Sequence, residues 1–170
     1  IQYLLTGKSL PKETVQYISK GSRHSNIKAK FTIQTETRRA LLDYTVRLER
    51  TAAETCQISR ETLAVRIWNE DRFSPQKMLI DCDLNEEQPI FKPKSRYDQL
   101  VRSNRDHKVD LIVAKRIANR ENSSFIFGSE GRAIFEDAPH NVFDDCAVFI
   151  EALHQYASVN LFVITNAHSG

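Results

Sequence analysis

The stretch AAETCQISRETLAVRIWN, residues 52–69, constrains the fold most strongly, because its spacing matches a helix-turn-helix. In that motif a small residue on the first helix lets the second helix approach closely. An apolar residue then fills the angle between the helices, and two apolar residues on the second helix complete the wedge. Ala53 is the small residue, Ile58 fills the angle, and Leu63 and Ile67 form the wedge. The sequence therefore predicts two helices that meet at a turn.

Two positions depart from the usual pattern of this motif. Gln57 occupies a turn position that usually holds glycine, and Cys56 stands where an aliphatic residue is common. A helix corner of this shape is also a common structural unit in small helical folds. The motif alone therefore allows two interpretations. The second helix recognises DNA, or the helix corner has only a structural role.

Two sets of residues would contact DNA if the second helix lay in a major groove. The bases would face the exposed residues early in that helix, which are Ser59, Arg60, Glu61 and Ala64. The phosphates would be contacted by Arg47, Arg50 and Arg66. If the corner packs on a partner protein instead, duplex binding would be weak, salt-sensitive and without sequence preference. The acidic Glu61 on the reading face favours this second outcome.

Charge is distributed unevenly along the chain. Residues 1–76 hold 13 Lys and Arg against 8 Asp and Glu, whereas residues 77–170 hold 11 against 14. A basic first part and a mildly acidic second part indicate two units with different partners. The basic excess is modest, so a solvated basic face without nucleic acid is an equally open explanation.

Composition and local patterns predict two domains in an α+β protein. The segment NEDRFSPQK, residues 69–77, is expected to join a helical helix-turn-helix domain (1–76) to a mixed α/β, sensor-like domain (77–170). The expected helices cover residues 11–20, 35–48, 59–68, 95–107 and 141–157. The expected strands cover residues 28–34, 77–82, 109–115 and 159–165, with a hairpin formed by SSFIFG and RAIFE around residues 129–131.

The sequence contains no complete catalytic or metal-binding motif. It has no HExxH, no CxxC and no clustered pair of histidines, so we expect no cofactor in this chain. Its three cysteines are widely spaced among apolar neighbours, which indicates reduced thiols in a cytoplasmic protein. The longest apolar runs, such as LFVI at 161–164, fall far short of the roughly 20 apolar residues that cross a bilayer.

Two segments resemble the ImmA/IrrE family of zinc metallopeptidases. In that family the catalytic helices are followed by A-x-x-L-L-M-P-x-x-x-F, and later by a segment similar to L-A-x-x-F-x-V-S-x-x-A-x-x-x-R-L. The first segment is matched loosely, because four residues are inserted within it, by Leu4, Leu5 and Pro11. The second is matched more closely, by Ile58, Ser59, Leu63, Arg66 and Ile67.

This resemblance implies a stress-response regulator. Family members carry a zinc-binding HExxH just upstream of the first segment, and they cut or inactivate a partner repressor after stress. Some place a GAF-like sensor domain after the helix-turn-helix, which residues 77–170 would match. The chain starts without Met, so we expect a fragment whose zinc and peptidase residues, if present, lie upstream of Ile1. No catalytic residue can be carried over, and enzyme activity stays undecided.

The sequence thus predicts a regulatory fragment of an ImmA/IrrE-like stress regulator. Its expected partners are a repressor protein or DNA, with a small-molecule ligand in the second domain and no membrane. One alternative is a DNA-binding transcription regulator with a C-terminal ligand-binding domain. Another is a protein-interaction scaffold in which the helix corner docks a partner.

Overall fold

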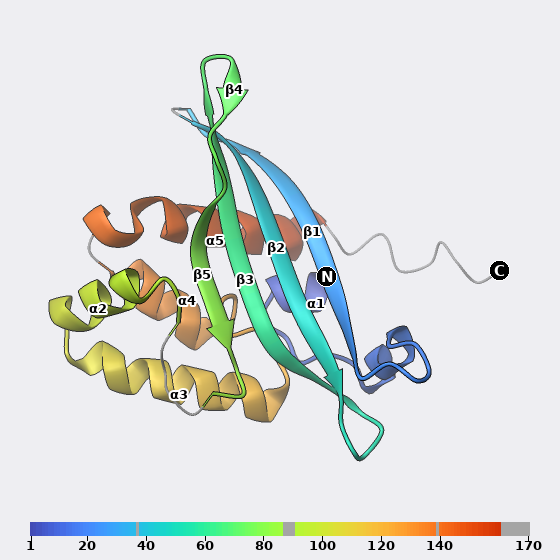
Figure 1. Cartoon of the computed structure of the whole chain (residues 1–170). Coiled ribbons are helices and arrows are strands. Elements are labelled where there is room, and N and C mark those ends of the chain that lie inside the picture. The colour runs from blue at the N-terminus through green and yellow to red at the C-terminus, as the bar shows by residue number, and fades with distance from the viewer. Residues whose placement is uncertain (37, 87–90, 139, 161–170) are drawn as a thin grey trace.

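The computed structural model describes residues 1–36, 38–86, 91–138 and 140–160. Within them the strands come first, most of the helices follow, and the helices cover one face of a curled antiparallel sheet (Figure 1). The strands are β1 (His24–Gln34), β2 (Arg39–Arg50), β3 (Cys56–Asn69), β4 (Arg72–Phe73) and β5 (Lys77–Asp83). The helices are α1 (Gln2–Leu5), the 3-10 helix η1 (Lys12–Tyr17), α2 (Lys94–Ser103), α3 (Asp106–Glu121), α4 (Ser129–Glu136) and α5 (His140–Asn160).

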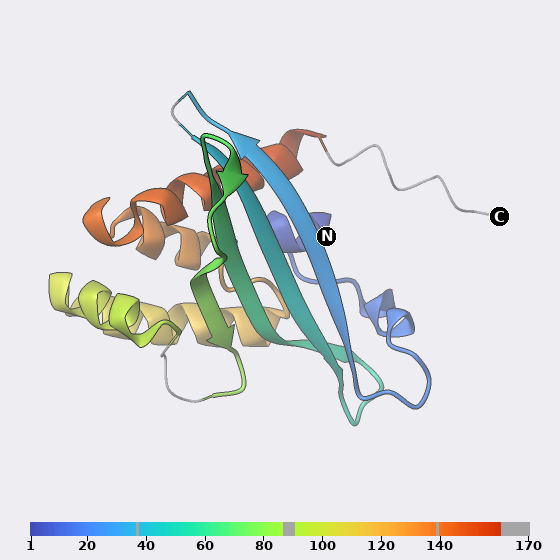
Figure 2. The same cartoon turned by 45° about the horizontal axis from the view of Figure 1, so that its top comes forward.

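The predicted fold class, a helix-turn-helix domain followed by a mixed α/β domain, is wrong. Residues 52–69, which were expected to form the helix corner, instead form a turn and strand β3. The strand pairs antiparallel with β2 on one side and with β4 and β5 on the other. Figure 2 shows in a second view that the helices lie behind the sheet and leave its other face open.

The residues of β2 alternate between the core and the opposite face. Ala40, Leu42, Tyr44, Val46 and Leu48 are buried, and the residues between them are partly exposed. This period of two is the signature of a strand with one buried face. Several of these apolar residues also fit a helical spacing, which explains why residues 35–48 were mistaken for a helix.

A β-bulge in β3 interrupts the alternation of buried and exposed residues along this strand. Arg47 pairs with Arg60 but Leu48 pairs with Ile58, so Ser59 is an extra residue in β3. Ile58 and Ser59 are consequently both buried, and the period of two is interrupted at that point. An acidic residue, Glu61, then occupies the next core-facing position. The bulge and this buried carboxyl group together made the strand resemble a turn followed by a helix.

The two halves of the chain share one sheet. The segment 69–77, expected to join the two domains, holds the tight β3–β4 connection, β4 itself and the start of β5. Because β5 pairs with β3, the boundary expected at residue 76 falls between two strands of the same sheet. The buried hydrophobic residues from both sides of that position also form one cluster.

Other predicted elements had mixed outcomes. The strands expected at 28–34 and 77–82 and the helix expected at 141–157 are confirmed as parts of β1, β5 and α5. Residues 109–115 were expected to be a strand but lie in α3, where Leu111, Ala114 and Ala118 face the core at helical spacing. The expected hairpin is a buried loop followed by α4. The last expected strand extends into residues 161–165, which lie outside the described residues.

The buried loop, residues 122–128, connects the helices to the sheet. Asn122 has φ 51°, ends α3 and bonds to β3 through its side chain. Its Oδ1 accepts from the Ile58 backbone N–H at 2.9 Å, and its Nδ2 donates to the Cys56 carbonyl oxygen at 2.8 Å. One amide side chain therefore satisfies two backbone groups of β3 and holds the end of α3 against the sheet.

Candidate functional site

The outer face of the sheet, turned away from the helices, gathers the cations of β1, β2 and β3. In the strand register Asn26 lies opposite Arg47, and Arg47 lies opposite Arg60. The next row holds Lys28, Thr45 and Thr62. This face is polar, whereas the alternate residues of the same strands pack toward the core. It is the solvated face of a one-sided sheet.

Arg47 and Arg60 form the centre of this face. They are direct cross-strand partners, and like charges in that position repel. Arg60 binds Asp81 through two bonds, from Nε to Oδ1 at 2.8 Å and from NH2 to Oδ2 at 2.6 Å. These bonds raise the pKa of Arg60 above its ordinary value. The Nε of Arg47 lies 3.5 Å from Oε1 of Glu49, which is too long for a strong hydrogen bond.

A shallow cavity of about 220 Å³ opens at this centre. Its lining consists of Asn26, Thr45, Arg47, Arg60 and Thr62. Each of these side chains can donate hydrogen bonds, two of them from a guanidinium. A negatively charged ligand group with several acceptor oxygens is the chemical match for such a lining.

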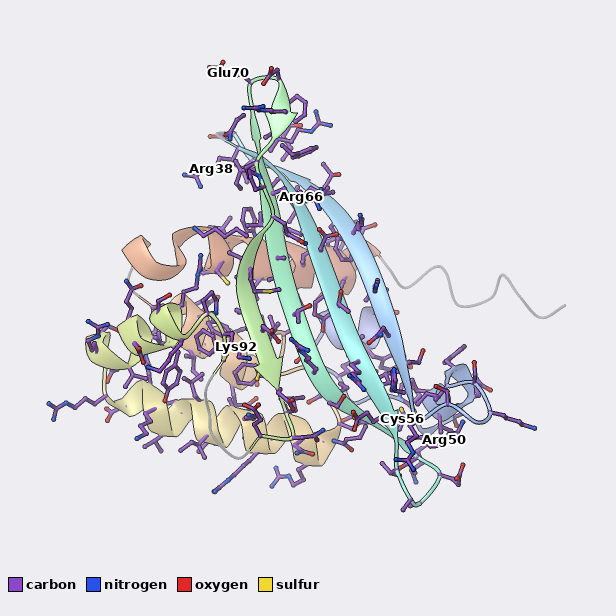
Figure 3. All side chains as sticks on the ribbon, in the orientation of Figure 1. Arg38, Arg50, Cys56, Arg66, Glu70 and Lys92 are labelled. Atoms are coloured by element: carbon purple, nitrogen blue, oxygen red, sulfur yellow. The ribbon has the colours of Figure 1, made fainter. Side chains whose placement is uncertain are left out.

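An aromatic pair lies where β3 meets β4, at the end of the sheet that projects furthest in Figure 1. Trp68 and Phe73 are paired across the two strands and contact each other edge to face, with ring centroids 4.9 Å apart. The guanidinium of Arg39 lies 5.6 Å from the centroid of the Trp68 ring, within cation–π range. Figure 3 shows Arg66 on the strand toward this same end, and Arg50 with Cys56 at the opposite end.

The residues predicted to contact DNA are Ser59, Arg60, Glu61, Ala64, Arg47, Arg50 and Arg66, and all lie on β2 and β3. Ser59, Glu61 and Ala64 are at most 3% exposed, so no recognition helix presents them. Arg50 binds Glu54 at 2.7 Å and the Ile18 carbonyl oxygen at 2.8 Å, which gives it a structural role. The structure does bring Arg47 and Arg60 together, and it places Arg66 further along the same face.

Glu61 is a fully buried carboxylate that the sequence reading placed on the surface. Its Oε1 accepts from the Tyr44 hydroxyl at 2.5 Å and from the Ser124 hydroxyl at 2.6 Å. Its Oε2 accepts from the backbone N–H groups of Phe125 at 2.6 Å and Ile126 at 3.4 Å. Burial raises the pKa of Glu61, although these hydrogen bonds partly oppose the rise. Glu61 thus fastens the buried loop to the sheet and faces away from any outer ligand.

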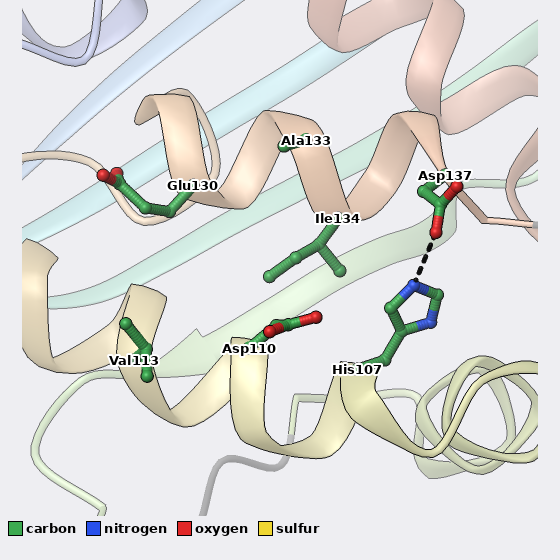
Figure 4. Close-up of a pocket in the computed structure, with 7 residues that line it drawn as sticks. All are labelled: His107, Asp110, Val113, Glu130, Ala133, Ile134 and Asp137. Carbon is green, nitrogen blue, oxygen red and sulfur yellow. Dashed lines mark hydrogen bonds and ion pairs between the residues drawn. The ribbon is translucent and has the colours of Figure 1, made fainter.

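A second cavity, of about 390 Å³, lies on the helical side between α3 and α4 (Figure 4). Its polar lining is His107, Asp110, Glu130 and Asp137, and its apolar lining is Val113, Ala133 and Ile134. The buried His107 ring contacts Asp137 through Nε2 at 3.1 Å and the Leu100 carbonyl oxygen through Nδ1 at 3.2 Å. Both ring nitrogens are therefore engaged within the protein.

The described residues that line these two cavities include no cysteine and no serine. The three cysteines are buried and form no disulfide, and burial raises the pKa of Cys82 to about 12, which keeps its thiol protonated. Within the described ranges, no three His, Cys, Asp or Glu side chains are grouped to hold a metal ion.

No helix in the described part of the chain has the length and apolar character needed to cross a membrane.

Comparison with known proteins gives no relative from which a function could be carried over. No family model, no curated protein and no solved structure matches the chain. The two cavities and the outer face are therefore interpreted from their own chemistry.

Proposed function

We propose that the protein is a binding module that holds single-stranded nucleic acid on the outer face of its sheet. The observation that carries this proposal is the direct opposition of Arg47 and Arg60 above a cavity lined by donors. A phosphate seated there would accept from both guanidiniums and from the hydroxyls of Thr45 and Thr62. Asp81 already neutralises Arg60, so the phosphate would mainly add a counter-charge for Arg47, whose ion pair with Glu49 is long at 3.5 Å.

The cations continue beyond this central cavity, which favours a polymer over a single small anion. Lys28 and Lys30 are exposed on β1, and Arg66 lies on β3 beyond Thr62. Residues two apart on a strand are separated by about 6.6 Å on the same face, so the charges form rows along the sheet. Part of this charge is offset by carboxylates on the same face, which are Asp43 beside Lys30, Glu49 beside Arg47 and Asp81 on Arg60. A chain of phosphates can therefore contact several cations at once.

The aromatic end of the sheet supplies a second element of nucleic-acid recognition. Trp68 is partly exposed, and bases stack on such rings with little dependence on sequence. We expect the protein to bind single strands more tightly than duplexes, because the unstacked bases of a single strand can lie on the open sheet. Reading of a duplex through a recognition helix has no support, because residues 52–69 hold no such helix.

The regulatory role expected from the ImmA/IrrE resemblance stays a prediction that rests on that resemblance alone. Ile58, Leu63 and Ile67, which carried it, are positions on β3 rather than on the helices of the family pattern. The expected repressor partner, the zinc upstream of Ile1 and the ligand in the second half likewise stay predictions. Nucleic-acid binding needs none of them.

We expect Arg47→Gln to weaken binding of a single-stranded oligonucleotide of about 12 nucleotides by about tenfold, because one charge-assisted contact is lost. Fluorescence anisotropy at about 50 mM and about 200 mM salt would measure this. The slope of log affinity against log salt should also fall by about 0.7, the value for one phosphate contact with a single strand.

Arg116→Gln is the matched control for this variant. Arg116 is exposed on α3 and far from the outer face, so its loss changes the net charge equally and should leave both affinity and slope nearly unchanged. If the two variants weakened binding equally, binding would depend on the net charge of the protein and not on the outer face. Tighter binding to a duplex of the same sequence would contradict the single-strand preference.

A further inference from the structure

We propose that the groove between α3 and α4 docks a basic segment of a partner protein, with an arginine side chain in the cavity. The groove is lined by three carboxylates and His107 around the apolar Val113, Ala133 and Ile134. It lies among the helices, behind the sheet, and so is separate from the proposed nucleic-acid surface (Figures 1 and 4). This inference does not depend on nucleic-acid binding.

Two of the three carboxylates in the lining have no ion-pair partner among the described residues. Asp137 contacts His107, but Asp110 and Glu130 form no ion pair or side-chain hydrogen bond with any described residue. The described residues that line the cavity include no Lys or Arg. An entering cation would therefore meet carboxylates that no described ion pair neutralises, and it could form charge-assisted hydrogen bonds with them.

The apolar part of the groove extends onto the surface of α3. Val113 is 45% exposed, and Val109, one turn earlier on the helix, is 60% exposed. Such a pair beside a cavity adds apolar contact area that the described part of the chain leaves exposed. In Figure 4 the side chain of Ile134 points from α4 toward α3 and lies between Asp110 and the acidic residues of α4.

These features together specify the occupant. A cation with a long aliphatic stem can lie on Ile134 and Ala133 while its charged head reaches Asp110 or Glu130. Arginine fits better than a bare amine, because its guanidinium binds carboxylates through two bonds. An apolar neighbour in the same segment would cover Val109 and Val113. The cavity of about 390 Å³ has the size of a ligand pocket and can admit one long side chain with part of its backbone.

The test uses the full chain and a fluorescein-labelled hexapeptide of alternating arginine and leucine. A second peptide replaces arginine by citrulline, which keeps the shape and removes the charge, and a third replaces leucine by alanine. We expect the arginine–leucine peptide to bind at least about tenfold more tightly than the citrulline peptide, because charge-assisted bonds are lost in the latter. The alanine peptide should also bind more weakly, since it covers less of the valine pair.

The double variant Asp110→Asn/Glu130→Gln should weaken the arginine–leucine peptide by about tenfold as well. Both side chains are exposed and unpaired, so this variant should fold normally. The matched control is Glu70→Gln/Asp71→Asn on the exposed β3–β4 connection, with the same change in charge and an expected change below about twofold.

Three results would overturn the proposal. Equal affinity for the arginine and citrulline peptides would remove the charge argument. Equal weakening by the groove variant and the control variant would move the binding away from α3 and α4. A dimer in sedimentation velocity that Asp110→Asn/Glu130→Gln dissolves would show that a second copy of the chain occupies the groove instead of a partner protein.

Discussion

Replacing Glu61 by alanine should lower the free energy of unfolding by about 4 kcal/mol. The change leaves the hydroxyls of Tyr44 and Ser124 and the backbone N–H groups of Phe125 and Ile126 without their acceptor inside the core. Each unsatisfied buried donor costs about 1–3 kcal/mol, and a total above about 4 kcal/mol is exceptional for one substitution. Chemical denaturation monitored by circular dichroism would measure the loss.

A pair of conservative variants isolates the role of the buried carboxylate. Glu61→Gln keeps one acceptor oxygen but directs an amide N–H₂ toward donors, so it should still be clearly destabilising. Glu49→Gln makes the same chemical change on the outer face and should cost less than about 1 kcal/mol, as exposed ion pairs do. Equal stability of the two variants would show that Glu61 does not hold the buried loop to the sheet.

The advantage of the wild type over Glu61→Gln should depend on pH. Burial raises the pKa of Glu61 above 4.5 in the folded protein, so the folded state holds its proton more tightly than the unfolded state. The stabilisation from this group is therefore complete below pH 4.5 and is lost as pH rises through the raised pKa. Unfolding of both proteins at pH values from below 4.5 to neutrality would test this, and a difference that grows with pH would contradict it.

Gly131→Ala should lower the free energy of unfolding by about 3 kcal/mol, although alanine favours a helix. Gly131 lies in the first turn of α4, and a Cβ there would overlap the carbonyl oxygen of Phe125 in the buried loop. That oxygen belongs to the backbone, so the clash can be relieved only if the loop or the helix moves. The midpoint of denaturant unfolding would report the change.

Ser129→Ala is the control for this prediction. Ser129 begins the same helix but is exposed, so its replacement should change stability by less than about 0.5 kcal/mol. If Gly131→Ala were instead stabilising by about 1 kcal/mol, as expected in an open helical position, the close contact between α4 and the buried loop would be disproved.

The elements predicted correctly are those whose local sequence pattern is compatible with only one type of secondary structure. β5 is a short apolar run after a proline-containing segment, and α5 carries apolar residues at consistent helical spacing. β2 and β3 were missed because their sequence patterns are compatible with both a helix and a strand. The bulge at Ser59 and the inward carboxylate of Glu61 break the alternation of β3, and both depend on pairing with β2 and on the distant buried loop. Local propensity alone cannot reveal such a dependence.

At the two candidate binding surfaces, some residues were identified from the sequence and others only from the structure. Arg47, Arg60 and Arg66 were identified from the sequence as contacts for phosphates or bases, although for a helix that does not exist. Asn26 and Thr45 were not identified, because their place beside the arginines follows from the strand register. The groove between α3 and α4 could not be foreseen either, since residues 109–115 were expected to be a strand and their helical face was not considered.

Mapping of backbone amide shifts by nuclear magnetic resonance tests the central claim most directly. In a titration with a single-stranded oligonucleotide, we predict the largest and saturable shifts at Thr45, Arg47, Arg60 and Thr62, with further shifts at Trp68. Residues of α3 and α4 should change little, because they lie on the opposite side of the molecule (Figure 2). Shifts confined to α3 and α4, or no saturable shift on β1, β2 and β3, would contradict the assignment of the outer face as the nucleic-acid surface.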